Sequence, residues 1–307
     1  MENAVFKIKL QGHFHDKESL RVEAYSTFDI AIATLQEFKE IEEELFSPVQ
    51  GWGSPLEYSG LELNNDFERT VKVEDETGKF PLNADDASLW NVLLEELDVE
   101  FSIRQSLSDA LLDWVDEDEL TRLNGAENDF YESLTPPYVA SNSPIQSQQE
   151  LFMIKGFTDI FINEEGNTNE TYQAYKESTS AYSSFPININ TAPPHVIGAL
   201  ARLSNVNTDL IDEHLLGLDN EAGTEDDLYF GSIAESPFAG NAASQSLISV
   251  TAKIIKITVT ITKGDSSFIL TGIVDVTKKS EKDSSSIEGV FIAYPFTIID
   301  LSENRNF

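Results

Sequence analysis

Cysteine is absent from the 307 residues of this chain. The fold therefore cannot depend on disulfide bonds, and the chain can form neither a cysteine-ligated zinc site nor a thiol nucleophile. The absence does not assign a cellular compartment, because many exported proteins also lack cysteine.

Basic residues are also few. The chain has 20 lysines and arginines against 54 aspartates and glutamates, which gives a formal net charge of −34. Such a charge repels nucleic acid and anionic membrane surfaces. It suits calcium, basic partners or simple solubility, and the clustering of the acids favours cation sites among these.

Long apolar runs and catalytic signatures are missing as well. No run of about 18 apolar residues occurs, so no segment is expected to span a membrane, and the first residues do not resemble a signal sequence. The patterns H-E-x-x-H, G-x-S-x-G, G-x-G-x-x-G and the P-loop are absent. None of the four histidines, at positions 13, 15, 195 and 214, lies in H-E-x-x-H. His13 and His15 are two positions apart and could contact one metal, but such a terminal pair is usually incidental. The sequence therefore gives no positive indication of an enzyme.

Hydrophobic periodicity predicts an α+β core. Apolar residues recur on one helical face between positions 17 and 45, at Leu20, Ala24, Phe28, Ala31, Leu35, Phe38 and Leu45. Alternating β-branched residues predict strands over 67–73, 247–262, 268–276 and 290–299, with a hairpin turn at positions 264 and 265. Residues 5–10 fit either a short strand or an extension of the helix.

A helical insert is predicted to interrupt this core. Residues 85–97, 103–120, 147–155, 193–204 and 207–216 have helical patterns, with Asp85 or Asp86 as an N-cap, and no convincing strand lies among them. The polar segment 163–184 is predicted to be a loop. We therefore divide the chain into the first part of the core at 1–81, an all-α inserted domain at 82–230, and C-terminal core strands at 231–307.

The insert has a helix-hairpin-helix-like element between residues 187 and 216. In DNA-binding relatives of this element, a glycine-rich hairpin and a lysine or arginine hold a phosphate. The hairpin here, LSNVN at 203–207, has no glycine and no base after it. Together with the charge of −34, this excludes nucleic acid as a predicted partner.

Acidic residues gather in two segments that could bind a hard cation. Between residues 109 and 132 there are nine acids and one base, Arg122. Acids near a helix C-terminus oppose the helix dipole unless a positive charge binds them, and calcium takes 6–8 oxygen ligands. The candidates are Asp113, Asp116, Asp118 and Glu127. The alternative is an acidic helix end that is simply solvated.

The second acidic segment is LGLDNEAGTEDDL at 216–228, with five acids and no base. Its glycines allow tight turns, but its spacing differs from that of an EF-hand. The segment is similar to the calcium loop of major pseudopilins. That resemblance implies Asp219 and Asp227 as side-chain ligands, Asp226 as a further candidate and the Leu216 carbonyl as another. A solvated surface turn is the alternative.

Five motifs in order resemble one known family. They are VEDETGKFPLN (73–83), LLDWVDEDE (111–119), GAENDFYESLTPPY (125–138), QQELFMIKGFT (148–158) and ININTAPPHVIGAL (187–200). Together they span about residues 68–203 and are similar to GspK, the large minor pseudopilin of bacterial type II secretion systems. The resemblance implies a pilin-like helix packed on an antiparallel sheet, a large α-helical insert with helix-hairpin-helix or SAM-like elements, and no enzymatic activity.

The resemblance also implies a role and partners. GspK-like subunits cap the periplasmic pseudopilus, in a tip complex with minor pseudopilins I and J above the major pseudopilin fibre, and they bind calcium in the insert. The expected location is the bacterial periplasm, with anchoring to the inner membrane by an apolar N-terminal helix missing from this chain. Met1 would then be an introduced start.

Two alternatives stay open. The strong acidity, the GTEDD loop and the N-terminal VFKIKLQGHFH depart from the family pattern. These departures leave open a second interpretation, a minor pilin of a related type IV pilus system. A secreted or surface calcium-binding interaction or adhesion protein is the other.

Overall fold

The computed structural model describes residues 2–62, 65–219, 224, 226–241, 246–278 and 294–306, with the backbone alone for 2–17, 305 and 306. Contacts divide the chain into two compact units. The core unit comprises Met1–Glu76 and Thr251–Phe307, and the insert unit comprises Thr77–Val250. We predicted the insert at 82–230.

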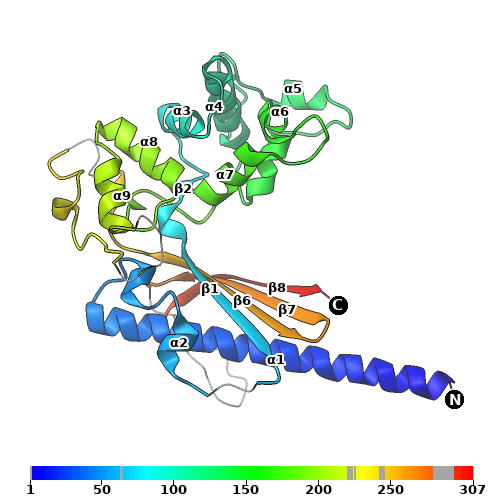
Figure 1. Ribbon diagram of the computed structural model, residues 1–307. Coiled ribbons are helices and arrows are strands. Elements are labelled where there is room, and N and C mark those ends of the chain that lie inside the picture. The colour runs from blue at the N-terminus through cyan, green and yellow to red at the C-terminus, as the bar shows by residue number, and fades with distance from the viewer. Residues whose placement is uncertain are drawn as a thin grey trace. The chain divides into compact units, whose positions relative to one another are not determined.

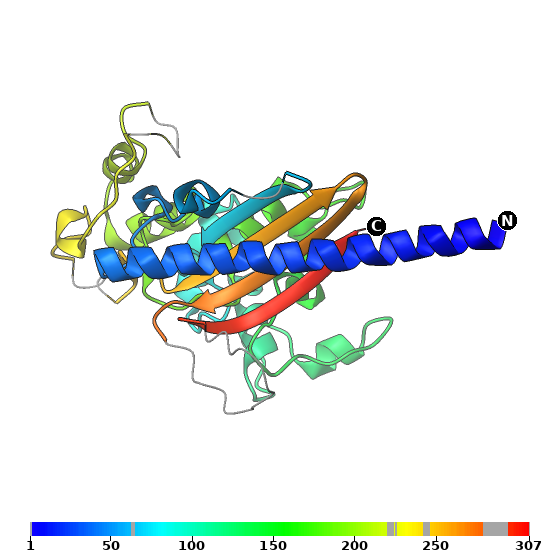
Figure 2. The same cartoon turned by 90° about the horizontal axis from the view of Figure 1, so that it is seen from below.

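One long helix and one sheet form the core unit. Helix α1, Glu2–Glu42, is followed by two short helical turns, η1 at Pro48–Gln50 and α2 at Pro55–Ser59. The sheet has the antiparallel order β1-β6-β7-β8, from strands Glu68–Asp75, Ile254–Lys263, Ser266–Asp275 and Thr297–Asn306. Figure 2 shows α1 lying across one face of these strands. Among the described residues, no helix combines the length and the apolar content needed to traverse a bilayer.

The two periodicities of the core unit meet at one apolar layer. On α1, Leu20, Ala24, Phe28, Ala31 and Leu35 are spaced three or four residues apart and are all inaccessible to solvent. On β6, every second residue is buried, namely Ile255, Ile257, Val259 and Ile261. The helix therefore covers the apolar face of the sheet, as the alternation predicts.

Both edge strands are also tied to α1 by charges. Arg69 of β1 donates to the Glu23 carboxylate through Nε at 2.8 Å. Glu303 of β8 accepts from Arg21 Nε at 2.7 Å and from the Tyr25 hydroxyl at 2.9 Å. The Arg21–Glu303 pair lies at the surface and contributes little free energy. The side chain of Arg69 is largely buried, so its pair with Glu23 is less exposed to solvent.

The insert unit consists mainly of short helices (Figure 1). It also contains strands β2 to β5, each two residues long. The α-helices are α3 (Ala87–Glu96), α4 (Phe101–Val115), α5 (Asn128–Glu132), α6 (Phe157–Phe161), α7 (Glu170–Ser178), α8 (Pro194–Ser204) and α9 (Asp209–Leu215). The 3-10 turns are η2 (Glu76–Gly78), η3 (Gln148–Met153) and η4 (Ile233–Glu235). The strands pair in parallel, β2 (Phe80–Pro81) with β3 (Thr179–Ser180), and β4 (Ile187–Asn188) with β5 (Ile248–Ser249).

Aromatic side chains fill the centre of the insert unit. Trp90, Trp114, Tyr131, Tyr175 and Phe161 are each shielded from solvent. Such rings bury large areas and favour edge-to-face contacts. The ring centroids of Trp114 and Tyr131 are 5.0 Å apart in that arrangement.

The fold class expected from the sequence is confirmed at its coarse level. The N-terminal helix packs on a four-stranded antiparallel sheet and is accompanied by a helical region, and residues 5–10 belong to α1. The helices predicted at 85–97, 103–120, 193–204 and 207–216 appear as α3, α4, α8 and α9. The helix predicted at 147–155 is the 3-10 turn η3.

Three expectations need correction. The segment 163–184 is not only loop, because it contains α7, where Asn169 caps the N-terminus and Tyr172 and Tyr175 turn to the core. The insert is not purely α-helical, since β2 to β5 lie in it. The strand predicted over 247–262 is two strands, because β5 pairs with β4 while β6 pairs with β1 and β7. Alternation marks extended backbone but does not identify its partner.

The last predicted strand is displaced. Strand β8 begins at Thr297, and residues 290–293 of the predicted segment lie outside the described residues.

The contact between α1 and β7 gives a testable prediction. A Cβ added at Gly272 would lie 2.5 Å from the Phe28 ring. We expect Gly272→Ala to lower the free energy of unfolding by about 1–3 kcal/mol, because the ring must shift within a filled core. Equilibrium urea unfolding measures this. Gly231→Ala is the matched control, since its Cβ would approach only the flexible Glu235 carboxylate, at 3.4 Å. Equal midpoints for both variants would contradict the close packing.

Candidate metal centre

Three carboxylates converge where α4 ends and α5 begins. Asp113 lies in the last turn of α4, Asp116 is its C-cap residue, and Glu127 is the N-cap residue of α5. One oxygen from each lies within 4.8 Å of the others. Asp113 and Glu127 are buried and Asp116 is half-buried. The chain between the two helices therefore folds back to bring acids from both of them together.

Arg122 provides the positive charge at this site. Its Nη1 is 2.6 Å from Asp113 Oδ1 and 2.5 Å from Asp116 Oδ2. Its backbone N–H donates to Asp113 Oδ2 at 3.1 Å. Gly125 also lies against Asp113, where any Cβ would collide with the carboxylate. Asp113 is therefore paired on both of its oxygens, and a larger residue at position 125 would disrupt this arrangement.

Glu127 has no comparable pairing among the described residues. Both of its carboxylate oxygens are buried with no hydrogen-bond partner among the described residues, and the same holds for Oδ1 of Asp116. Burial, together with the negative charges of Asp113 and Asp116, raises the pKa of Glu127 to about 7. An ionised carboxylate in this position is costly unless a cation neutralises it. The site therefore has more negative charge than Arg122 compensates.

The loop between α4 and α5 is held in place from several sides. The Asp109 carboxylate accepts from the Asn124 backbone N–H at 3.3 Å and from its side-chain amide at 3.1 Å. Lys155 Nζ donates to the Gly125 carbonyl at 2.9 Å and to the Asn124 carbonyl at 3.3 Å. These contacts fix the loop, and with it the position of Glu127.

The donor set suits a hard divalent cation. It consists of oxygen alone, since no cysteine exists and no histidine is in the cluster. Carboxylate oxygens are the preferred ligands of calcium and magnesium, whereas transition metals favour imidazole or thiolate. Three carboxylates provide too few ligands for calcium unless bidentate binding, carbonyls or water complete the shell.

Of the four residues predicted in this segment, three come together and one does not. Asp113, Asp116 and Glu127 form the cluster. Asp118 lies in the exposed part of the loop, where its Oδ1 accepts from the Leu120 N–H at 2.7 Å. The contributions of Arg122 and Lys155 were not predicted from the sequence. Arg122 could have been found from the sequence, because it is the single base among nine acids. Lys155 could not, because it lies about thirty positions further along the chain and the sequence does not show that it contacts the loop.

In the second acidic segment, Thr224 is surrounded by carboxylates. Its hydroxyl lies 3.4 Å from Asp219 Oδ1, 2.8 Å from Asp226 Oδ1 and 3.2 Å from Asp227 Oδ1. A hydroxyl can donate only one hydrogen bond. Asp226 also accepts from the Leu218 N–H at 2.7 Å, and this bond is the main cause of its lowered pKa. Residues 220–223 and 225 lie outside the described residues, so Asp219, Asp226 and Asp227 stay predicted ligands.

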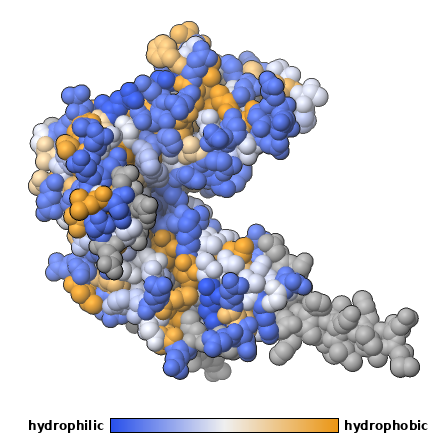
Figure 3. Space-filling view, in the orientation of Figure 1, coloured by the Kyte–Doolittle hydropathy of each residue, from blue (hydrophilic) through white to orange (hydrophobic). Residues whose placement is uncertain are grey.

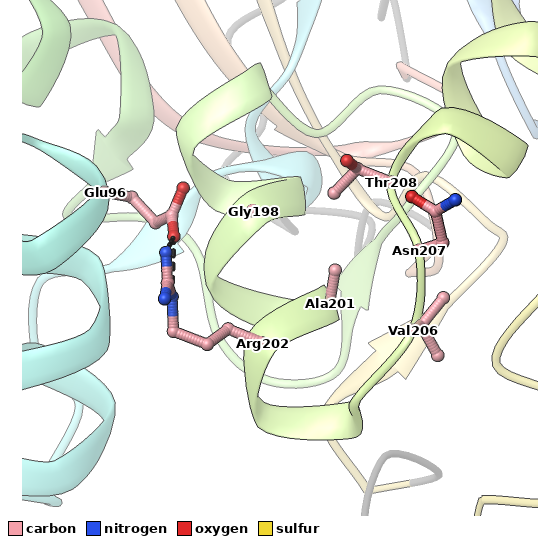
Figure 4. Close-up of a pocket in the computed structure, with 7 residues that line it drawn as sticks. All are labelled: Glu96, Gly198, Ala201, Arg202, Val206, Asn207 and Thr208. Atoms are coloured by element: carbon pink, nitrogen blue, oxygen red, sulfur yellow. Dashed lines mark hydrogen bonds and ion pairs between the residues drawn. The ribbon is translucent and has the colours of Figure 1, made fainter.

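Helix α8 and the hairpin that follows it border a shallow hollow of about 300 Å³ (Figure 4). Arg202 of α8 points across it to α3, with Nη2 2.5 Å from Glu96 Oε1 and Nη1 3.1 Å from Glu95 Oε1. The hairpin residues Val206, Asn207 and Thr208 form the other wall. The arginine that could hold a phosphate is thus paired with two glutamates.

The environment of Glu127 predicts a dependence of stability on pH. Because its pKa in the folded state lies above its ordinary value of 4.5, the native state holds a proton that the unfolded state loses between pH 4.5 and about 7. Stability without metal should therefore fall as pH rises through that window. In EDTA, we expect the free energy of unfolding of Glu127→Gln, relative to wild type, to increase by on the order of 1–3 kcal/mol between pH 5 and pH 8. Thermal unfolding measures this, with exposed Glu132→Gln as control. A difference that does not change with pH would refute it.

Part of the chain is similar in sequence to known proteins. Residues 69–183 match the family model described as type II secretion system (T2SS), protein K. Type II secretion system protein K from Klebsiella pneumoniae is 30% identical over 50% of the chain and 48% of its own length. The Pseudomonas aeruginosa protein is 28% identical over 49% of the chain and 45% of its own length. The chain thus matches about half the length of these relatives.

A solved structure extends the likeness in fold. It is the GspK-GspI-GspJ complex from the type 2 secretion system of enterotoxigenic Escherichia coli. The match has a TM-score of 0.66 at 16% identity and covers 97% of this chain and 99% of the other. At this identity the match shows the fold alone. The family match rests on residues 69–183, which contain both α4 and α5 and therefore the carboxylate cluster. The resemblance read from the five motifs is confirmed, because the matched part of the chain is similar to type II secretion system protein K.

Proposed function

We propose that the chain is a non-enzymatic structural subunit at the tip of the periplasmic pseudopilus of a type II secretion system. The observation that carries the proposal is the combination of a helix-on-sheet core with the motif-bearing insert, in a fold that matches a chain of the solved GspK-GspI-GspJ complex over nearly its whole length. The partners in this proposal are minor pseudopilins of the I and J type, above the major pseudopilin fibre. The location is the periplasm, with an inner-membrane anchor in a longer protein.

The core unit supplies the means of assembly in this proposal. Helix α1 presents its apolar stripe to the sheet, while Val22 and Ile41 on its other sides are 64% and 63% exposed. Helices of neighbouring pseudopilins could pack along that outer surface by the usual ridges and grooves. The insert adds a second compact unit to the subunit. Such bulk suits a subunit that ends a fibre better than one that repeats along it.

Calcium would stabilise the insert by neutralising the carboxylate cluster. Asp113, Asp116 and Glu127 are the residues that would hold it, and Glu127 fits best because its buried oxygens have no other partner among the described residues. When bound, the cation supplies positive charge and connects α4 to α5. Arg122 already pairs with Asp113 and Asp116, so a cation must share or replace its contacts.

The calcium proposal predicts a thermal shift. Ligand that binds the native state alone raises the free energy of unfolding by about 2.7 kcal/mol at a hundredfold excess over Kd. We expect millimolar CaCl₂ to raise the melting temperature by several degrees over excess EDTA, and MgCl₂ to do so less. Glu127→Gln should lose most of the shift, while exposed Glu132→Gln keeps it, and Asp219→Ala reports on the second acidic segment. No shift, or an equal one with magnesium, would rule out a calcium site.

The tip proposal predicts assembly. Mixed with the soluble parts of I- and J-type subunits from the same system and calcium, the chain should co-elute with them as one complex on a sizing column. Val22→Glu and Ile41→Glu should weaken that complex without changing the melting temperature, because both side chains are exposed. Exposed Leu210 on α9 serves as the control position, as Leu210→Glu. Separate elution of all three wild-type chains would refute the tip assignment.

A further inference from the structure

The loop between α4 and α5 displays two leucines to solvent. Leu123 is 95% exposed and Leu120 is 77% exposed, only three positions apart. Isolated exposed leucines are common. Here, however, they lie in a loop of which several polar groups form hydrogen bonds within the protein. We call residues 117–124 the leucine loop.

The leucine loop is anchored by its polar groups. Arg122, which lies between the two leucines, turns its guanidinium to Asp113 and Asp116, and its backbone N–H donates to Asp113. The Leu120 N–H donates to Asp118, and Asn124 is bound to Asp109. The loop therefore has a defined shape, with its charged base turned inward and its leucines outward. A preordered surface loses less entropy on binding than a mobile one.

Acids border the two leucines. Glu117, Asp118 and Glu119 precede Leu120, and all three are exposed. Asp129 and Glu132 of α5 are exposed as well. In Figure 3, the visible face of the insert unit is mostly hydrophilic, with isolated apolar patches. The leucines are thus an apolar element within an acidic rim.

The negative charge of the acids beside the leucines indicates which kind of partner could cover them. A second copy would bring the same acids together on a chain of net charge −34, which opposes self-association. An anionic lipid surface would repel the rim in the same way. A protein with an apolar cleft bordered by lysine or arginine would satisfy both the leucines and the acids.

We propose that the leucine loop is a docking surface for a protein partner that places an apolar cleft over Leu120 and Leu123 and lysine or arginine side chains over Glu117, Asp118 and Glu119. The interaction is separate from assembly through α1, so it does not depend on the tip assignment. Complementary charge would guide the partner to the loop and make the association sensitive to salt.

Site-specific photo-crosslinking tests this proposal in cells that carry the full protein. A benzophenone amino acid replaces Leu123, and mass spectrometry identifies the adduct and the crosslinked segment. We expect one dominant protein adduct whose crosslinked segment is apolar and adjoins lysine or arginine. The yield should fall about tenfold when Leu120→Ser is added, and likewise for the triple variant Glu117→Lys, Asp118→Lys and Glu119→Lys. Leu210→Ser is the control, because Leu210 is exposed on α9.

The identified partner is then purified for titration against the intact chain. Leu120→Ser with Leu123→Ser should weaken binding at least about tenfold, the order expected when even one buried apolar side chain is lost. Raising NaCl from about 50 to about 500 mM should also weaken binding of the wild-type chain. At constant salt, the double variant should keep the wild-type melting temperature and its co-elution with the I- and J-type subunits. Adducts only to lipid or to another copy, no adduct, or an adduct indifferent to Leu120→Ser would each overturn the proposal. Failure of co-elution alone would count against the tip assignment.

Discussion

The fully buried carboxylate of Asp113 is the constraint on which the insert around α4 depends. A charge in that position has to be paired, and Arg122 pairs with it through both its side chain and its backbone. That pairing fixes the path of the chain after α4 and requires glycine at position 125. It also places Glu127 in the same buried space without a partner among the described residues. The path of the loop and the convergence of the three carboxylates therefore have one cause.

Pairing of opposite charges also explains how α8 joins α3 in so acidic a chain. Arg202 joins α8 to α3 through Glu95 and Glu96, and His195 Nδ1 lies 2.9 Å from the Glu96 carbonyl. Gly198 permits this approach, because a Cβ there would collide with Glu96. These contacts pack α8 against α3.

Sequence patterns predicted the parts of the fold that depend on a single periodicity. The stripe from Leu20 to Phe38 and the alternation from Ile255 to Ile261 each define one buried face, and α1 and β6 follow. Helix α7 was missed because only two tyrosines among polar residues mark its buried face, a weak signal without knowledge of the core. The carboxylates of the cluster could be named from their density. The contact of Lys155 with the loop could not, because it joins residues about thirty positions apart.

The place where the insert joins the core has a consequence for folding. Strands β1 and β6 pair directly, with Asp75 opposite Ile255, although the entire insert unit separates them in the chain. Closing so long a loop costs chain entropy, yet this cost grows only logarithmically with length. An insert that folds first shortens the effective loop to the distance between its own two ends. The adjacency of β1 and β6 therefore allows a large domain to be carried between neighbouring strands while the sheet remains a simple antiparallel one.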